Sequence, residues 1–272
     1  FLAGIWRKRS MENRFNIDLA FLPDDEAERL YRRYPYIGED SESYCPTCEK
    51  RGTIQWKGKT WKCDCHHQLQ LYKHYLAAGI GVTYQRLEWQ DIEGNDKIIE
   101  DISKYLEKHQ QYVNRGVGLF FSGPVGTGKT MLANLVLKWF VKYGYTCFAT
   151  TFAQTIDYLT AGWSSPEDKV YFRRKFVESQ VLLLDDVGRE HRTKLSDTTF
   201  DSILRTRVQE GRPTIITTNM NFAEIQSGYG AAVLSLLKES SISFEFEGED
   251  FRPKSQQRTV DEVRAGLTRP IT

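Results

Sequence analysis

The sequence lacks a long hydrophobic run, a strong net charge and any broad use of cysteine. No apolar stretch approaches the about 20 residues that a membrane-spanning helix needs, so we expect no membrane segment. The 37 basic and 36 acidic side chains nearly cancel, so overall charge does not predict nucleic-acid binding. In residues 1–9 the charges follow the apolar part, which is the reverse of a secretory signal. These absences argue against membrane and exported classes.

Cysteine use is low but uneven, because four of the five cysteines fall between residues 45 and 65. They form two pairs, and the stretch 53–62 between the pairs is typical of a hairpin that turns at residues 57–59. Such a hairpin would bring the pairs together, as tetrahedral coordination of Zn²⁺ requires. The predicted zinc ligands are Cys45, Cys48, Cys63 and Cys65.

Four thiolates leave no open coordination position, so we interpret this zinc site as structural. His66 or His67 could replace Cys65 as the fourth ligand, because all three lie within reach of the site. One metal site in a reducing, cytoplasmic compartment explains the clustering better than disulfides do. Loss of the metal should unfold the small module, which cannot bury much core of its own.

Strand-like and helix-like segments alternate from residue 118 onward. This alternation predicts an α/β fold with a parallel sheet covered by helices on both faces. The stretch 241–247 alternates with period two and predicts a late edge strand. The expected strands are 118–122, 146–150, 181–185 and 213–219, and the expected helices are 129–143, 152–161, 166–178 and 197–210.

Four parts are expected along the chain. An amino-terminal arm over 1–40, with a short helix opening at residue 24, precedes the zinc-binding module over 41–80. The main α/β domain follows over 81–255, with a first helix over about 96–114, and a basic tail closes the chain over 256–272. The tail fits a solvated segment and a binding segment equally well.

The strongest motif is a glycine-rich loop between the strand 118–122 and the helix that follows it. It fits G-x-x-x-x-G-K-[ST], in which successive backbone N–H groups wrap the phosphates of a nucleotide. Lys129 should reach the β- and γ-phosphates of ATP, and Thr130 should ligate Mg²⁺. The loop consists of Gly123, Pro124, Val125, Gly126, Thr127, Gly128, Lys129 and Thr130.

Two further polar positions follow predicted strands. Asp185 and Asp186 end an apolar strand, and adjacent carboxylates there are costly to desolvate without a cation. We interpret Asp185 as a Mg²⁺ ligand and Asp186 as the group that orients the attacking water. Asn219 ends the fourth strand, where it would flank the γ-phosphate.

The sequence resembles the bacterial replicative-helicase loaders in four features. These are the cysteine module, the glycine-rich loop, the strand that ends in Asp-Asp and the strand that ends in Thr-Thr-Asn. These form the DnaC/DnaI branch of the AAA+ ATPases, with the IstB transposition ATPases close by. The resemblance covers about residues 45–255 and is nearer to DnaI in its zinc module and its Asp186. It implies an AAA+ P-loop domain, ATP hydrolysis and self-association.

The resemblance also assigns residues one by one. Arg252, after the late strand, is similar to the cis-acting sensor arginine that contacts the γ-phosphate. Family members usually carry an arginine finger in the helix over 230–238, where this chain has Ala232 and Leu236. Either another cation substitutes for the finger or hydrolysis is weak. The candidates for that role are Lys238, Arg205 and Arg207.

In this family the region between the second and third strands contacts single-stranded DNA. Here it contains aromatic and basic side chains, which fit stacking on bases and pairing with phosphates. The same side chains also fit a core and a solvated helix face. The residues assigned to DNA by the resemblance are Tyr171, Arg173, Arg174 and Lys175.

The resemblance implies that the arm and the zinc module dock on a hexameric replicative DNA helicase. Trp56 and Trp61 suit such an interface or the small core of the module. The leading hypothesis is therefore an ATP-dependent helicase loader. The competing hypotheses are an IstB-like ATPase that remodels DNA and recruits a transposase, and an ATP-binding scaffold with little turnover.

Overall fold

A five-stranded parallel sheet forms the centre of the protein, in a computed structural model that describes residues 24–33, 53–161, 170–171, 173–190, 193–267, 269 and 271–272. The strand order is β4-β5-β6-β3-β7, and every neighbouring pair is parallel. The predicted parallel α/β sheet is therefore confirmed, with the late strand at one edge. The strands are β3 (Gly118–Ser122), β4 (Cys147–Thr151), β5 (Val181–Val187), β6 (Thr214–Thr218) and β7 (Ser241–Glu245).

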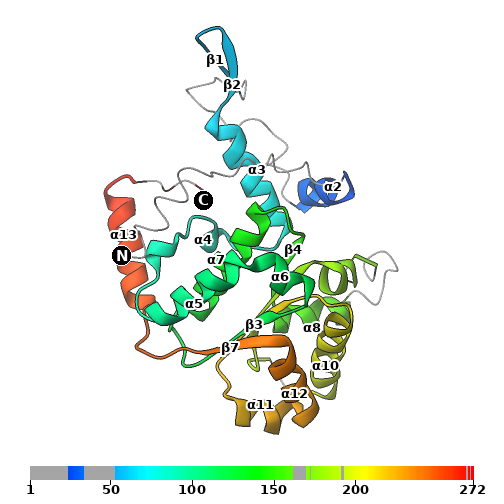
Figure 1. Ribbon diagram of the computed structural model, residues 1–272. Coiled ribbons are helices and arrows are strands. Elements are labelled where there is room, and N and C mark those ends of the chain that lie inside the picture. The colour runs from blue at the N-terminus through cyan, green and yellow to red at the C-terminus, as the bar shows by residue number, and fades with distance from the viewer. Residues whose placement is uncertain are drawn as a thin grey trace.

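Helices cover both faces of this sheet (Figure 1). On one face Leu119 and Leu183 contribute to a buried cluster that includes residues of α3, α5 and α7. On the other, Phe120 and Leu182 join a second cluster with residues of the helices that follow β4 and β5. Neighbouring strand residues thus enter opposite clusters, as the pleat requires. The helices are α3 (Asp64–Ala77), α5 (Asp96–Glu107), α6 (His109–Asn114), α7 (Lys129–Lys142), α8 (Phe152–Ala161), α10 (Lys194–Gln209), α11 (Phe222–Tyr229) and α12 (Ala231–Ser240).

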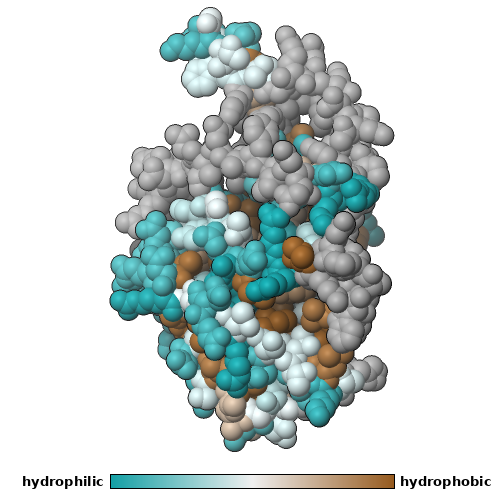
Figure 2. Space-filling view, turned by 90° about the vertical axis from the view of Figure 1, so that its right-hand side faces the viewer, coloured by the Kyte–Doolittle hydropathy of each residue, from teal (hydrophilic) through white to brown (hydrophobic). Residues whose placement is uncertain are grey.

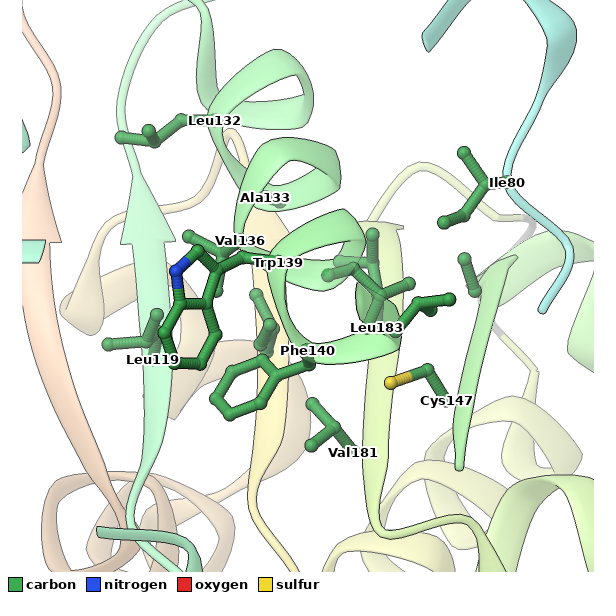
Figure 3. Packing of buried hydrophobic residues seen from close by; sticks show 14 of the residues in the cluster. Ile80, Leu119, Leu132, Ala133, Val136, Trp139, Phe140, Cys147, Val181 and Leu183 are labelled. Carbon is green, nitrogen blue, oxygen red and sulfur yellow. The ribbon is translucent and has the colours of Figure 1, made fainter. Parts of the chain in front are cut away.

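Helix α7, which follows the glycine-rich loop, lies against the centre of the sheet. It is buried almost along its whole length, from Leu132 to Val141. Val136 and Phe140 of this helix lie in one buried cluster with Leu119 of β3 and Leu183 of β5 (Figure 3). This packing fixes the helix axis and therefore the place where its amino-terminal N–H groups point.

Two predicted helices differ in the structure. The helix expected over 96–114 is interrupted at Lys108, which separates α5 from α6. Within the segment expected over 166–178, residues Arg174–Glu178 form a π-helical turn, η4, and residues 162–169 and 172 lie outside the described part. The guanidinium of Arg207 donates to carbonyl oxygens of Phe176, Val177 and Ser179, which supports this wider turn.

The amino-terminal part includes a two-stranded hairpin, β1 (Thr53–Trp56) and β2 (Lys59–Lys62). Lys57 and Gly58 both have positive φ, at 51° and 72°, as a tight two-residue hairpin turn requires. The predicted hairpin is confirmed, and it projects away from the sheet at the far end of α3 (Figure 1). Helix α2 (Asp24–Arg33) lies beside α3.

The chain from α3 to α5 runs past the edge of the sheet toward the glycine-rich loop. Ala149 of β4 donates its N–H to Ala78 O at 2.7 Å, and this contact covers part of the sheet edge. Gly79 has φ of 74°, and a Cβ there would lie 2.3 Å from Ala149 O. The helix α4 (Val82–Gln85) and the turn η2 (Trp89–Asp91) follow.

Helix α13 (Arg252–Arg264) and the residues after it pack back onto this segment. Asp91 accepts hydrogen bonds from Arg258 at 3.2 Å and from Arg269 at 2.7 and 2.8 Å. The boundary expected at residue 255 falls inside α13. None of the helices in the described ranges is long and apolar enough to cross a membrane.

Candidate nucleotide-binding site

The glycine-rich loop lies between β3 and α7, at the carboxyl edge of the sheet. Gly126 and Gly128 have φ of 80° and 93°, in the left-handed region that other residues rarely adopt. A Cβ on Gly123 would lie 2.3 Å from Phe246 O, and one on Gly126 would lie 1.9 Å from Asp250 Oδ1. Glycine is therefore required here both by the backbone conformation and by the close packing. The loop lies between a strand and a helix, as the sequence predicted.

Lys129 is the first residue of α7 and is only 5 % exposed. Its Nζ donates to the carbonyl oxygens of Gly123 at 2.7 Å and Pro124 at 2.5 Å. Burial lowers the pKa of the Lys129 ammonium, while the carboxylates of Asp186 and Asp185 raise it. The charged group thus lies inside the loop, where a phosphate would replace the carbonyls as its partner.

Asp185 connects the strand end with the loop. Its Oδ1 accepts a hydrogen bond from Thr130 at 2.8 Å and another from Thr217 at 2.5 Å. Burial raises the pKa of the Asp185 carboxyl, although these two hydroxyl donors lower it. A partly buried carboxylate beside a hydroxyl provides the hard oxygen ligands that Mg²⁺ prefers, so these residues fit the predicted metal site.

Asp186 stands at an irregularity in the sheet. The pairing of β5 with β6 shifts register between Leu184 and Val187, and Asp186 has a φ of 56°. Its N–H donates to Thr217 Oγ1 at 2.9 Å, while its Oδ2 lies 3.3 Å from Nη1 of Arg189. Bulges and left-handed residues of this kind occur at sites where a side chain is re-aimed for function.

Asn219 and Arg252 are both exposed beside this centre. Asn219 directly follows β6, and Arg252 begins α13. The segment before Arg252 is attached to the loop, because Phe251 donates its N–H to Gly126 O at 3.0 Å. Burial is the main cause that lowers the pKa of Lys129, and the positive charge of Arg252 lowers it further. The two cations are therefore close enough to interact electrostatically.

Sequence reasoning missed three residues that the fold brings to the site or behind it. Thr217 precedes Asn219 by two positions and contacts both aspartates, yet a threonine inside a strand carries no signal by itself. Tyr84 comes from α4; burial raises its pKa, and Asp185 and Asp186 add to that rise. Lys138 donates to Tyr84 O, Gln85 O and Leu87 O at 3.2, 2.9 and 2.7 Å, which holds this segment against α7.

Two predicted cations serve other roles in the structure. Arg207 is 0 % exposed and fully engaged with backbone carbonyls, so it cannot act as a finger on a neighbour's ATP. Lys175 is 6 % exposed, and its Nζ lies 2.9 Å from Glu26 Oε1 of α2. The Lys175 ammonium is thus engaged inside the protein, and its predicted contact with DNA stays a prediction.

A cavity of about 600 Å³ surrounds that ion pair, beside β4 and away from the glycine-rich loop. Arg29 of α2 lies over the ring of Tyr171, with Cζ 4.4 Å from the ring centroid. Glu26, Arg29, Tyr158, Tyr171 and Lys175 line the cavity. Arg173 and Arg174 are exposed in the same segment.

The predicted zinc site falls largely outside the described residues. Cys45 and Cys48 lie there, and so does the side chain of Cys65. Cys63 is described; it is buried and directly precedes α3. The hairpin that should bring the two pairs together is present, while the zinc ligands stay a prediction.

The part of the chain that contains this site matches a known protein family. The profile of the IstB-like ATP-binding proteins matches residues 85–258. An uncharacterised protein of Escherichia coli, YdaV, is 27 % identical over 138 residues, covering 50 % of this chain and 56 % of the relative. The putative ATP-binding protein of insertion sequence IS5376 from Geobacillus stearothermophilus is 28 % identical over 154 residues, with 54 % and 59 % coverage. The chain thus spans little more than half the length of these relatives.

A solved structure is similar over a larger share of its own length. The crystal structure of the DnaC helicase loader superposes with a TM-score of 0.52 at 25 % identity, covering 61 % of this chain and 95 % of that one. The similarity therefore extends across nearly all of that structure.

Proposed function

Because the chain belongs to the family of IstB-like ATP-binding proteins, we propose that it is an AAA+ ATPase that loads a hexameric replicative helicase onto single-stranded DNA. The contact of Thr130 and Asp185 beside the buried Lys129 is the observation that carries the ATPase part. The similarity to the DnaC helicase loader supports the loading part.

Each residue of the site has a role in the proposed hydrolysis. Thr130 and Asp185 would hold Mg²⁺, and the bound ion would supply positive charge that offsets the negative charge of the phosphates. Lys129 leaves the loop carbonyls for the phosphates, and Asp186 accepts a hydrogen bond from the attacking water and orients it. Asn219 and Arg252 contact the γ-phosphate from the fourth strand and from α13.

Hydrolysis is proposed to be slow in the isolated chain. The helix α12 has Ala232 and Leu236 at the positions where the family resemblance expects an arginine. With Arg207 buried, the remaining candidates for a finger between self-associated copies are Lys238 and Arg205. Lys238 is exposed and lies over the ring of Phe222, and Arg205 is paired with Asp201 on α10.

The partner contacts are proposed for the two regions outside the nucleotide site. The amino-terminal arm and the zinc module, with Zn²⁺ bound by the four cysteines, would bind the helicase. Tyr171, Arg173 and Arg174 would contact single-stranded DNA, since exposed cations and an aromatic ring suit a flexible strand.

Capture of a replicative helicase tests the loader. The full chain, immobilised and supplied with ATP, should retain a purified hexameric helicase, and it should place that helicase on a single-stranded circle. Lys129→Ala should retain the helicase but lose ATP-dependent placement, because the amino-terminal contact does not use the nucleotide site. Failure of the wild-type chain to retain any replicative helicase would contradict the proposal.

A transposition ATPase is the second candidate, favoured by the insertion-sequence relative and by the family as a whole. It predicts ATPase activity stimulated by duplex DNA more than by single strands, together with retention of a transposase. Turnover measured with each DNA form separates the candidates. Near-background turnover with both forms, unchanged in Lys129→Ala, would favour an ATP-binding scaffold instead.

A further inference from the structure

The β1–β2 hairpin presents two large aromatic side chains to solvent. Trp56 is 58 % exposed and Trp61 is 50 % exposed, although tryptophan is among the costliest side chains to leave in water. Among the described residues, neither ring is therefore buried in a core. Figure 2 shows the hairpin at the top of the molecule, with its side chains in hydrophilic and neutral colours.

The strand register places both rings on one face of the hairpin. Ile54 lies opposite Trp61, and Trp56 lies opposite Lys59. Opposite residues of an antiparallel pair share a face, and so do residues two apart along a strand. Ile54, Trp56, Lys59 and Trp61 thus form one surface, which we call the tryptophan face. Gln55 and Thr60 form the other surface and hydrogen-bond each other at 2.7 Å.

Positive charge accompanies this face. Lys57, in the turn, holds its Nζ 4.3 Å from the centroid of the Trp56 ring, and Lys59 lies on the face itself. The stretch 53–62 contains lysines at 57, 59 and 62 and no acidic residue. Exposed aromatic rings can stack on unpaired bases, and nearby lysines can pair with phosphates. A surface with both, and with no acidic residue in the stretch, therefore complements a single strand of nucleic acid.

We propose that the tryptophan face is a binding surface for single-stranded nucleic acid, separate from the nucleotide site and from residues 171–174. Unpaired bases stack on Trp56 and Trp61, and Lys57 and Lys59 pair with the phosphates. The two lysines and the lack of acidic residues in 53–62 favour phosphates as the partner, and a protein partner for the same face is an outcome that the test below distinguishes. The proposal does not depend on helicase loading.

The test uses the full chain without nucleotide and a fluorescent oligothymidylate. Trp56→Ala/Trp61→Ala should weaken binding by about tenfold or more, and the conservative Trp56→Phe/Trp61→Phe should restore part of the loss. Lys57→Gln/Lys59→Gln should reduce the dependence of affinity on salt concentration. Tryptophan fluorescence of the wild type should be quenched on binding, and the quenching should disappear in the phenylalanine variant.

A matched control comes from the same hairpin. Gln55→Ala/Thr60→Ala changes the opposite surface and should leave affinity for the oligonucleotide unchanged. Equal weakening by both alanine pairs would mean that the hairpin acts only through its fold, and this would overturn the proposal. Wild-type affinity in the tryptophan variants would overturn it as well. Loss of helicase capture with unchanged oligonucleotide binding would assign the face to a protein partner instead.

Discussion

At the residue scale, the partly buried carboxylate of Asp185 lowers the stability of the folded protein at neutral pH. Burial raises the pKa of this carboxyl in the folded state. Between its ordinary and raised pKa the folded protein binds more protons than the unfolded chain, so stability falls as pH rises through that window. At neutral pH the ionised group is therefore destabilising, and the proposed Mg²⁺ would offset this cost.

Asp185→Asn should accordingly stabilise the nucleotide-free protein slightly at neutral pH while it abolishes Mg²⁺-dependent ATPase activity. The amide oxygen can still accept from Thr130 and Thr217, and no charge is desolvated. Urea unfolding at neutral pH and at a pH below the ordinary aspartate pKa measures this, since the difference should vanish where Asp185 is protonated. A variant that is less stable than wild type at neutral pH would contradict this account.

The motif predicted the loop and its lysine because that chemistry depends on residues close together in sequence. Thr217 and Tyr84 escaped prediction for a physical reason. Each reaches the site through the fold, from the interior of β6 and from α4, and neither position differs in sequence from ordinary strand or helix residues. The ion pair of Lys175 with Glu26 also escaped prediction, because Glu26 is distant in sequence and approaches Lys175 only through the packing of α2.

At the element scale, Arg207 connects α10 with η4 and β6. Its guanidinium donates to Phe176 O at 3.0 Å, Ser179 O at 2.9 Å and Pro213 O at 2.7 Å, and to Thr214 Oγ1 at 2.9 Å. The contacts of Arg207 with these elements could not be predicted from the sequence, because a basic residue on an amphipathic helix is normally expected at the surface. Burial lowers the pKa of this guanidinium.

Arg207→Leu should lower the free energy of unfolding by about 2–4 kcal/mol, because several carbonyl oxygens lose their donors inside the protein. Arg205→Leu, on the same helix, is the control: its ion pair with Asp201 is partly exposed and should matter little. Urea denaturation of both variants measures the contrast. Equal effects would mean that the buried contacts of Arg207 are no stronger than a surface pair.

At the scale of the whole molecule, the sheet and the projecting hairpin are supported by different means. The sheet has two buried clusters, whereas the hairpin leaves both tryptophans exposed. The alternation of strand-like and helix-like segments in the sequence predicted the sheet well. The positions of α2 and α13 could not be predicted, because the ion pairs that attach them join segments distant in sequence.

Removal of the predicted zinc should therefore unfold the amino-terminal module and spare the sheet. Cys45→Ser should lose one Zn²⁺ per chain by native mass spectrometry. Hydrogen exchange should rise in β1 and β2 and stay slow in the strands β3, β5 and β6, because the hairpin has little core to replace the metal, whereas the strands belong to the two buried clusters. A chain that folds without metal, with unchanged exchange in the module, would refute the zinc site.

The position of β3 between β6 and β7 has a consequence for synthesis on the ribosome. Its residues pair with Ile215 and Ile216 on one side and with Ser241 to Glu245 on the other, all of which are translated much later. At roughly 5–20 residues per second, the apolar strand carrying Phe120 and Phe121 waits several seconds for both neighbours. The nascent chain thus exposes an aggregation-prone strand during translation, and it cannot assemble a nucleotide site until the sheet is nearly complete.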